Sequence, residues 1–186
     1  MSNHYWQGDL IQLRAIEDQD LTFFESLDDD VNRNMDMLHF PRTKQQIISW
    51  FEGQRQRMLG DAFRLVAVNK DDVVVGTIDT FDCNRRHGTF KYGILISEAY
   101  RRLGYAQEMI RMVLLYYFYE LGYQKVTPHI YSFNTASIKL HERMGFVKEG
   151  QLRNMLYTNG QHHDEIYYGM TKEEYIARYG GYGDLN

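Results

Sequence analysis

Residues 94–109, ILISEAYRRLGYAQEM, have the pattern expected of an anion-binding site. Three apolar strand residues lead through a polar loop with Arg101 and Arg102 to Gly104 and the start of an apolar-striped helix. The free N–H groups and the dipole of a helix N-terminus attract anions. A glycine there lets the backbone approach a ligand closely. The sequence therefore predicts a phosphate or pyrophosphate site, and with it a phosphorylated cofactor.

Two common phosphate-binding motifs do not fit this segment. A dinucleotide site needs G-x-G-x-x-G directly after an early strand, whereas Gly104 stands alone in the middle of the chain. A nucleoside-triphosphate loop needs G-x-x-x-x-G-K-[ST], which the sequence lacks. The remaining pattern is Arg101-x-x-Gly104-x-Ala106. Taken alone, it also fits an ordinary helix entry with a solvated arginine.

A second motif accompanies the first. The segment NTASIKLHERMGF runs from Asn134 to Phe146 and begins 28 residues after Ala106. With both motifs, the chain resembles the GNAT superfamily of acetyl-CoA-dependent N-acetyltransferases over roughly residues 9–175. The segments LRAIEDQDL and EGQLRNMLYTNGQHHD are similar to one branch of it. That branch holds ribosomal-protein N-terminal (alanine or serine) acetyltransferases and spermidine acetyltransferases.

The resemblance implies a fold, a cofactor and a reaction. The fold would be a single α/β domain whose mixed central sheet has splayed strands flanked by helices. The cofactor would be acetyl-CoA, and a primary amine of a small molecule or a protein N-terminus would attack it directly in a ternary complex. The cofactor-binding residues would be Ile94, Leu95 and Ile96 along the pantetheine arm, Arg101, Arg102, Leu103, Gly104, Tyr105 and Ala106 around the pyrophosphate, and Asn134 and Ser137.

The chain departs from the family pattern at His141, where many members have a tyrosine proposed to protonate the leaving thiolate. A histidine can donate a proton near neutral pH, so His141 is the candidate catalytic acid. The alternative, of about equal weight, is a half-buried histidine on a short helix, satisfied by a backbone carbonyl.

A second departure is Lys91, where related members often have a glutamate near the substrate amine. A charged lysine cannot accept the proton of that amine. Asp79, Asp82 or a water molecule could do so, and positioning with backbone donors could supply much of the rate. The two departures also motivate an alternative from another class, a non-catalytic acyl-CoA-binding module.

The segment Met35–Thr43 would form part of the substrate wall by resemblance. It carries one acid, Asp36, and one base, Arg42, which is little counter-charge for a polycation. The sequence therefore disfavours a polyamine substrate. No metal site is expected, because His162 and His163 are neighbours on a predicted strand and point to opposite faces.

The bulk composition is that of an ordinary globular protein. The 186 residues are 44% hydrophobic and 25% charged, which suits one domain over residues 1–186. A net charge of −4 without a Lys/Arg run argues against nucleic-acid binding, and no apolar segment is long enough to cross a membrane. The single cysteine, Cys83, suits the cytoplasm. The oligomeric state stays open, a homo-oligomer included.

Turn and cap residues divide the chain into alternating elements. Strands are expected at 9–16, 62–69, 73–82, up to Ile96, and 125–131, and on both sides of Asn159–Gly160. Helices are expected from Asp18 or Asp20 to about 27, from 43 to Gly60, after Gly104 to Gly122, from Asn134 to Gly145, and from Thr171 to about 179, before a frayed tail. Pro128 makes its strand an edge strand or a locally unpaired one.

Overall fold

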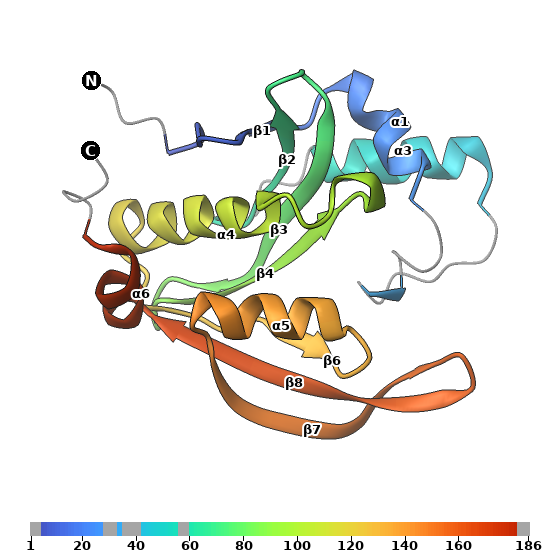
Figure 1. Ribbon diagram of the computed structural model, residues 1–186. Coiled ribbons are helices and arrows are strands. Elements are labelled where there is room, and N and C mark those ends of the chain that lie inside the picture. Colours follow the sequence, from blue (N-terminus) through green and yellow to red (C-terminus); the bar gives the residue numbers. More distant parts are fainter. Residues whose placement is uncertain (1–4, 28–32, 35–41, 56–59, 182–186) are drawn as a thin grey trace. The chain divides into compact units, whose positions relative to one another are not determined.

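The computed structural model describes residues 5–27, 33–34, 42–55 and 60–181. The chain divides into two compact units, which are considered separately. Unit 1 comprises Met1–Phe81 and Gly93–Met112, and unit 2 comprises Asp82–Tyr92 and Val113–Asn186. Figure 1 labels the elements, of which β3 (Val74–Asn84), β4 (Thr89–Ile96) and α4 (Tyr105–Leu115) each contribute residues to both units.

Unit 1 contains the strands β1 (Ile11–Ala15) and β2 (Arg64–Asn69), most of β3 and the C-terminal part of β4, arranged in the order β1-β2-β3-β4. Strands β1 and β2 are antiparallel, as are β2 and β3, with a bulge between Ala67 and Val68. The predicted hairpin after residue 62 is therefore confirmed.

Besides the N-terminal part of α4, unit 1 contains α1 (Leu21–Glu25), which follows a 3-10 turn at Asp18–Asp20, and α3 (Lys44–Arg55). The hydroxyl of Thr43 accepts a hydrogen bond from the Gln46 amide, as expected of a cap at the start of α3. The buried apolar side chains of these helices and of the strands form one core, which consists of Ile16, Phe23, Phe24, Phe51, Val66, Val68 and Leu95. The core fixes β4 in this unit through Leu95.

Unit 2 contains the N-terminal part of β4, the strands β5 (Lys125–Val126), β6 (His129–Tyr131), β7 (Val147–Thr158) and β8 (Gln161–Thr171), and the helices α5 (Thr135–Met144) and α6 (Lys172–Tyr179). Strand β5 is parallel to β4 and antiparallel to β8, which also pairs with β6 and β7. The sheet is thus mixed, and the predicted α/β fold class is confirmed.

The expected strand 125–131 is interrupted at Pro128. The parallel ladder joins Thr89 to Lys125 and Phe90 to Val126, and the Thr127 amide adds one more bond to the Phe90 carbonyl. After Pro128, β6 pairs with β8. The prediction of a locally unpaired strand is confirmed, because proline has no N–H to extend the ladder.

The helix after Gly104 ends differently from the expectation. Instead of continuing as an α-helix to Gly122, α4 stops at Leu115 and a π-helical turn covers Tyr116–Glu120. Such a turn inserts one residue into the helical repeat and rotates the following side chains. Sequence periodicity does not reveal it, because the aromatic run YYFYE fits either kind of turn.

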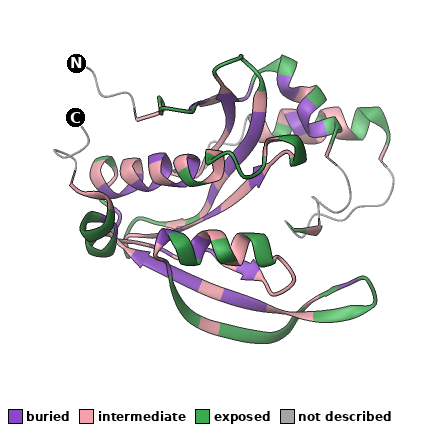
Figure 2. Ribbon diagram, in the orientation of Figure 1, coloured by how far each residue is buried: buried purple, intermediate pink, exposed green. Residues whose placement is uncertain are grey.

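The hairpin of β7 and β8 is asymmetric in burial, as Figure 2 shows. Its turn, Asn159–Gly160, has positive φ at both residues, as predicted for Asn-Gly. Strand β8 buries most of its C-terminal half, from Glu165 to Met170, whereas β7 exposes Val147, Leu152, Met155 and Tyr157. Two irregularities interrupt the ladder of β7, between Lys148 and Gly150 and between Leu152 and Leu156.

Most of the predicted substrate wall, Met35–Thr43, lies outside the described residues, as do the end of the helix that begins at 44 and most of the tail. Within the described ranges, no helix is long and apolar enough to span a membrane. The single-domain organisation over residues 1–186 stays a prediction.

Candidate active site

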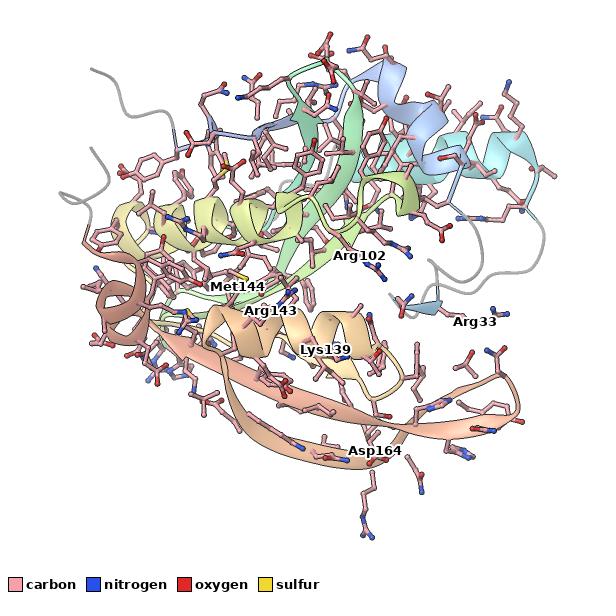
Figure 3. The ribbon with its side chains drawn as sticks, viewed as in Figure 1. Arg33, Arg102, Lys139, Arg143, Met144 and Asp164 are labelled. Atoms are coloured by element: carbon pink, nitrogen blue, oxygen red, sulfur yellow. The ribbon has the colours of Figure 1, made fainter. Side chains whose placement is uncertain are left out.

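The predicted pyrophosphate loop lies in unit 1, between a 3-10 turn at Glu98–Tyr100 and the start of α4. Arg102 and Gly104 have positive φ angles of 66° and 90°, so the loop turns sharply before the helix. Arg101, Arg102 (labelled in Figure 3) and Gly104 are exposed. The first amides of α4 precede its first intrahelical bond, from the Glu108 amide to the Gly104 carbonyl, and can therefore donate to an anion.

Strand β4 supplies the predicted pantetheine-binding residues. Leu95 is 6% exposed and belongs to the core of unit 1, whereas Ile94 and Ile96 are only partly buried. The Leu95 carbonyl lies so close to Gly76 of β3 that a Cβ at this position would collide with the carbonyl oxygen. The close approach of β3 thus determines where the backbone of β4 runs.

Replacing Gly76 with alanine should lower the free energy of unfolding by about 1–3 kcal/mol, because the added methyl group displaces a backbone carbonyl rather than a flexible side chain. Urea denaturation measures the change. The control is Gly53→Ala in α3, where nothing lies within 4 Å of the added Cβ. That variant should gain up to about 1 kcal/mol from helix propensity. Equal effects of the two substitutions would contradict the role of Gly76.

Unit 2 brings Asn134, Ser137 and His141 together at α5. The side chain of Asn134 accepts a hydrogen bond from the Ser137 amide at 3.1 Å and caps the helix, as predicted. Gly145, with φ of 89°, ends the helix. In Figure 3, Lys139, Arg143 and Met144 mark α5, and Met144 is buried.

His141 is buried, with 2% exposure, and both of its ring nitrogens have partners in unit 2. Nδ1 donates to the Ser137 carbonyl at 2.8 Å, since a carbonyl oxygen can only accept. In the neutral ring, Nε2 then accepts from the Tyr92 hydroxyl at 2.8 Å. The imidazole also packs against the ring of Phe146, with centroids 5.0 Å apart.

Burial controls the protonation of this pair. Desolvation lowers the pKa of His141 to about 4, although the hydrogen bond to the Ser137 carbonyl acts in the opposite direction. Burial also raises the pKa of Tyr92 well above its usual value. Near neutral pH, both side chains are therefore uncharged, and the hydrogen bond between them joins two neutral groups.

The two predicted candidate bases are held by cations. Asp79 lies 2.9 Å from the Arg64 guanidinium in unit 1, and Asp82 lies 3.1 Å from the ammonium of Lys91 in unit 2. The Lys91 ammonium also lies 5.9 Å from the centroid of the Tyr167 ring. Lys91 is thus an ordered residue of the β4 surface with an acidic and an aromatic partner.

A group of polar residues in unit 2 was missed from the sequence. Glu165 of β8 is a buried carboxylate that contacts Nε2 of His129 at 3.3 Å and accepts a hydrogen bond from the Tyr167 hydroxyl at 3.1 Å. His129 is the first residue of β6 and follows Pro128, where the pairing with β4 has ended. These side chains meet because of the register of β6 and β8, in which His129 pairs with Tyr167 and Tyr131 with Glu165. A single amino-acid sequence does not reveal this register.

Within the described part of the chain, no group of His, Cys, Asp and Glu side chains could hold a metal ion. His162 and His163 lie on β8, where His162 contacts the ring of Tyr157 and His163 that of Phe133.

Comparison with known proteins agrees with these features. The family described as "Acetyltransferase (GNAT) domain" matches residues 11–147. The SPbeta prophage-derived uncharacterized N-acetyltransferase YokL of Bacillus subtilis is 49% identical over 97% of this chain and 100% of its own length. The spermidine N(1)-acetyltransferase of Vibrio cholerae is 26% identical over 90% of this chain and 96% of its own.

The fold also matches that of solved acetyltransferases. The structure of spermidine N-acetyltransferase from Vibrio cholerae in complex with CoA and spermine superposes with a TM-score of 0.79. It is 22% identical, and the match covers 91% of this chain and 99% of that one. With the family match over most of the sequence, the resemblance predicted from two motifs is confirmed. The chain belongs to the GNAT acetyltransferase family and is an N-acetyltransferase that transfers the acetyl group of acetyl-CoA to an amine.

Proposed function

We propose that a primary amine attacks the thioester of acetyl-CoA directly, in a ternary complex and without a covalent enzyme intermediate. The observation that carries the cofactor assignment is the exposed loop Arg101–Gly104 in front of the free amides of α4. The Arg101 amide donates to the Glu98 carbonyl at 3.2 Å, so the amides from Arg102 to Ala106 would bind the pyrophosphate beside the Arg101 side chain. The backbone of Ile94–Ile96 would bind the pantetheine arm. Asn134 and Ser137 would hold the arm from α5.

For the acceptor, we propose a small primary amine or a protein N-terminus rather than a long polycation. The Vibrio cholerae relative is solved with spermine. The sequence of the segment Met35–Thr43, however, contains one acid, Asp36, and one arginine, Arg42. One carboxylate is little counter-charge for a molecule with several ammonium groups.

The geometry favours the second interpretation of His141, a core histidine satisfied by a backbone carbonyl. Both ring nitrogens make hydrogen bonds. A ring with a pKa of about 4 is unprotonated near neutral pH and therefore has no acidic proton to give to a thiolate. We therefore propose that His141 holds Tyr92 and α5 in place. Protonation of the leaving thiolate by His141 is the competing prediction, and substitution of His141 separates the two.

The single thiol, Cys83, suits the reducing cytoplasm, which we propose as the compartment. An assembly of several copies of the chain is compatible with this function. Sedimentation velocity measures the oligomeric state directly.

The test of the proposed function is transfer of labelled acetyl from acetyl-CoA to a panel of amines. The panel contains a polyamine, an amino sugar, small monoamines and peptides with free N-termini. We expect turnover with at least one monoamine or peptide, with one CoA released for each acetyl group transferred. When the amine is omitted, we expect no labelled acetyl group on the protein. Binding of acetyl-CoA without release of CoA, whichever amine is added, would support the acyl-CoA-binding module instead.

A matched pair of glycine variants tests the cofactor loop. Gly104 and Gly160 both have positive φ, 90° and 76°, so valine strains either backbone. Gly104→Val should abolish measurable acetyl-CoA binding, because a β-branched side chain distorts the positive-φ turn before the α4 amides and its Cβ would lie 3.1 Å from Cδ1 of Leu10. Gly160→Val, at the tip of the β7–β8 hairpin with nothing within 4 Å, should bind normally. Unchanged binding by Gly104→Val would remove the loop from the site.

A further inference from the structure

The carboxylate of Glu108 is held by three consecutive backbone amides of the N-terminal segment in unit 1. Its Oε1 accepts from the amides of Asp9 at 2.8 Å and Leu10 at 3.2 Å. Its Oε2 accepts from the amides of Leu10 at 3.0 Å and Ile11 at 2.9 Å. These bonds join the start of β1 to the first turn of α4, across almost a hundred residues of sequence.

The N-terminal segment is shaped to receive this carboxylate. A Cβ at Gly8 would lie 2.6 Å from Cδ of Glu108, so only glycine leaves the necessary space. The Gly8 amide donates to the Ile11 carbonyl at 2.8 Å and closes the turn. Ile11 is 2% exposed and anchors the segment in the core. The receptor for Glu108 is therefore a fixed part of unit 1.

The same contact reaches the loop in front of α4. Cδ1 of Leu10 lies 3.1 Å from the position of a Cβ at Gly104. Leu10 thus packs on the backbone of Gly104, while its own amide is bound by Glu108. Glu108 thereby positions a side chain against the glycine that turns the chain into the helix.

The charge of Glu108 gives the contact a second consequence. A carboxylate in the first turn of a helix competes with an external anion for the positive end of the dipole. Three amides of another segment supply Glu108 with its own donors and turn its charge away from the amides of the loop. Without them, the carboxylate would be free to move toward the anion site.

We propose that Glu108 is a positioning residue for the cofactor loop, which it holds through Leu10 while its charge is kept away from the bound pyrophosphate. This inference rests on the proposed function, in which the amides from Arg102 to Ala106 bind the pyrophosphate of CoA.

The test exploits Gly8. Because Gly8→Ala displaces the flexible end of a side chain and not backbone, it should release Glu108 without unfolding the protein. We expect the Kd for CoA, measured by calorimetry, and the KM for acetyl-CoA to rise about fivefold, the scale of one charge at a helix terminus. The kcat should not change. Turnover of S-acetylpantetheine, which lacks the pyrophosphate, should be unaffected, whereas a merely structural defect would lower both reactions.

One double variant and the dependence on salt separate the effect of the Glu108 charge from the effect of its anchoring. Glu108→Gln in the Gly8→Ala background removes the released charge, so CoA affinity should recover toward that of the wild type. The difference in the Kd for CoA between Gly8→Ala and the wild type should also become smaller at high salt, because salt screens the released charge. Gly53→Ala, an exposed glycine of α3, is the control and should bind CoA normally.

Equal losses with acetyl-CoA and S-acetylpantetheine, or unchanged CoA affinity in folded Gly8→Ala, would overturn the role of Glu108. Failure of the double variant to recover would overturn the charge part of it. If wild-type protein bound no CoA, the proposed function itself would fail, so the two failures are distinguishable.

Discussion

Substitution of His141 with alanine is expected to lower the free energy of unfolding by about 3 kcal/mol, the usual cost of removing a large buried side chain. The ring is 2% exposed and packs between Tyr92 and Phe146. Its loss leaves a cavity and a buried Tyr92 hydroxyl without its acceptor. Urea denaturation at pH 7.5 measures the change.

The control for this substitution is His87→Ala, in the exposed turn between β3 and β4, which should cost less than about 0.5 kcal/mol. A loss below about 1 kcal/mol for His141→Ala would mean that the ring is not part of the packed core.

The same residue decides between the two chemical interpretations. Loss of a general acid lowers the rate by about 10²–10⁴-fold. If His141 is a core histidine, His141→Gln, assayed at a temperature where it is folded, should retain kcat within about tenfold of the wild type. Thiol release from acetyl-CoA measures the rate. A loss of kcat of a hundredfold or more with intact folding would restore His141 as the catalytic acid.

The free energy of unfolding should fall by about 3 kcal/mol as the pH is lowered from 7 to below 4, through His141 alone. The pKa of His141 is lowered from 6.5 to about 4 in the folded protein. The unfolded chain therefore binds a proton from about pH 6.5 downward, while the folded chain does not until about pH 4. The stabilisation is fully present above pH 6.5, is lost progressively below it, and levels off below pH 4.

Because carboxylates also titrate in this pH range, the contribution of His141 is measured as the difference in the free energy of unfolding between the wild type and a His141 variant. Urea denaturation of wild type and His141→Gln across pH 4–8 should give curves that converge as the pH falls, since only the wild type loses this contribution. His87→Gln should follow the wild type. Parallel curves for the wild type and His141→Gln would show that His141 has the same pKa in the folded and the unfolded protein.

The elements of this fold were predictable where local chemistry determines them. Asn159–Gly160 required a hairpin, Asn134 and Gly145 marked the ends of α5, and Pro128 broke a strand. These residues act through their own backbone angles and hydrogen bonds. The exposed turn before α4 was predictable for the same reason, because a glycine between a strand and a helix exposes amides wherever the rest of the chain lies.

The contacts that act through space were not predictable. Glu108 and the amides of residues 9–11 meet across almost a hundred residues. His129 and Glu165 meet because of the register of β6 and β8. Likewise, the contact of the Tyr92 hydroxyl with Nε2 of His141, which bears on both interpretations of this residue, depends on the tertiary fold. In each case the residue type was visible, but its partner depended on the tertiary fold.

Strand β7 has a consequence for how the protein behaves in a crowded solution. An exposed strand with apolar side chains is a template on which other chains can add strands and aggregate. Its most exposed apolar side chains are those of Tyr157, at 63%, and Met155, at 55%. The two breaks in its ladder, with Lys148 and Arg153 among its residues, deprive an incoming strand of a straight, uncharged edge. Deleting the extra residues at the irregularities of β7 would make its ladder regular, and we therefore expect it to lower the solubility of the protein.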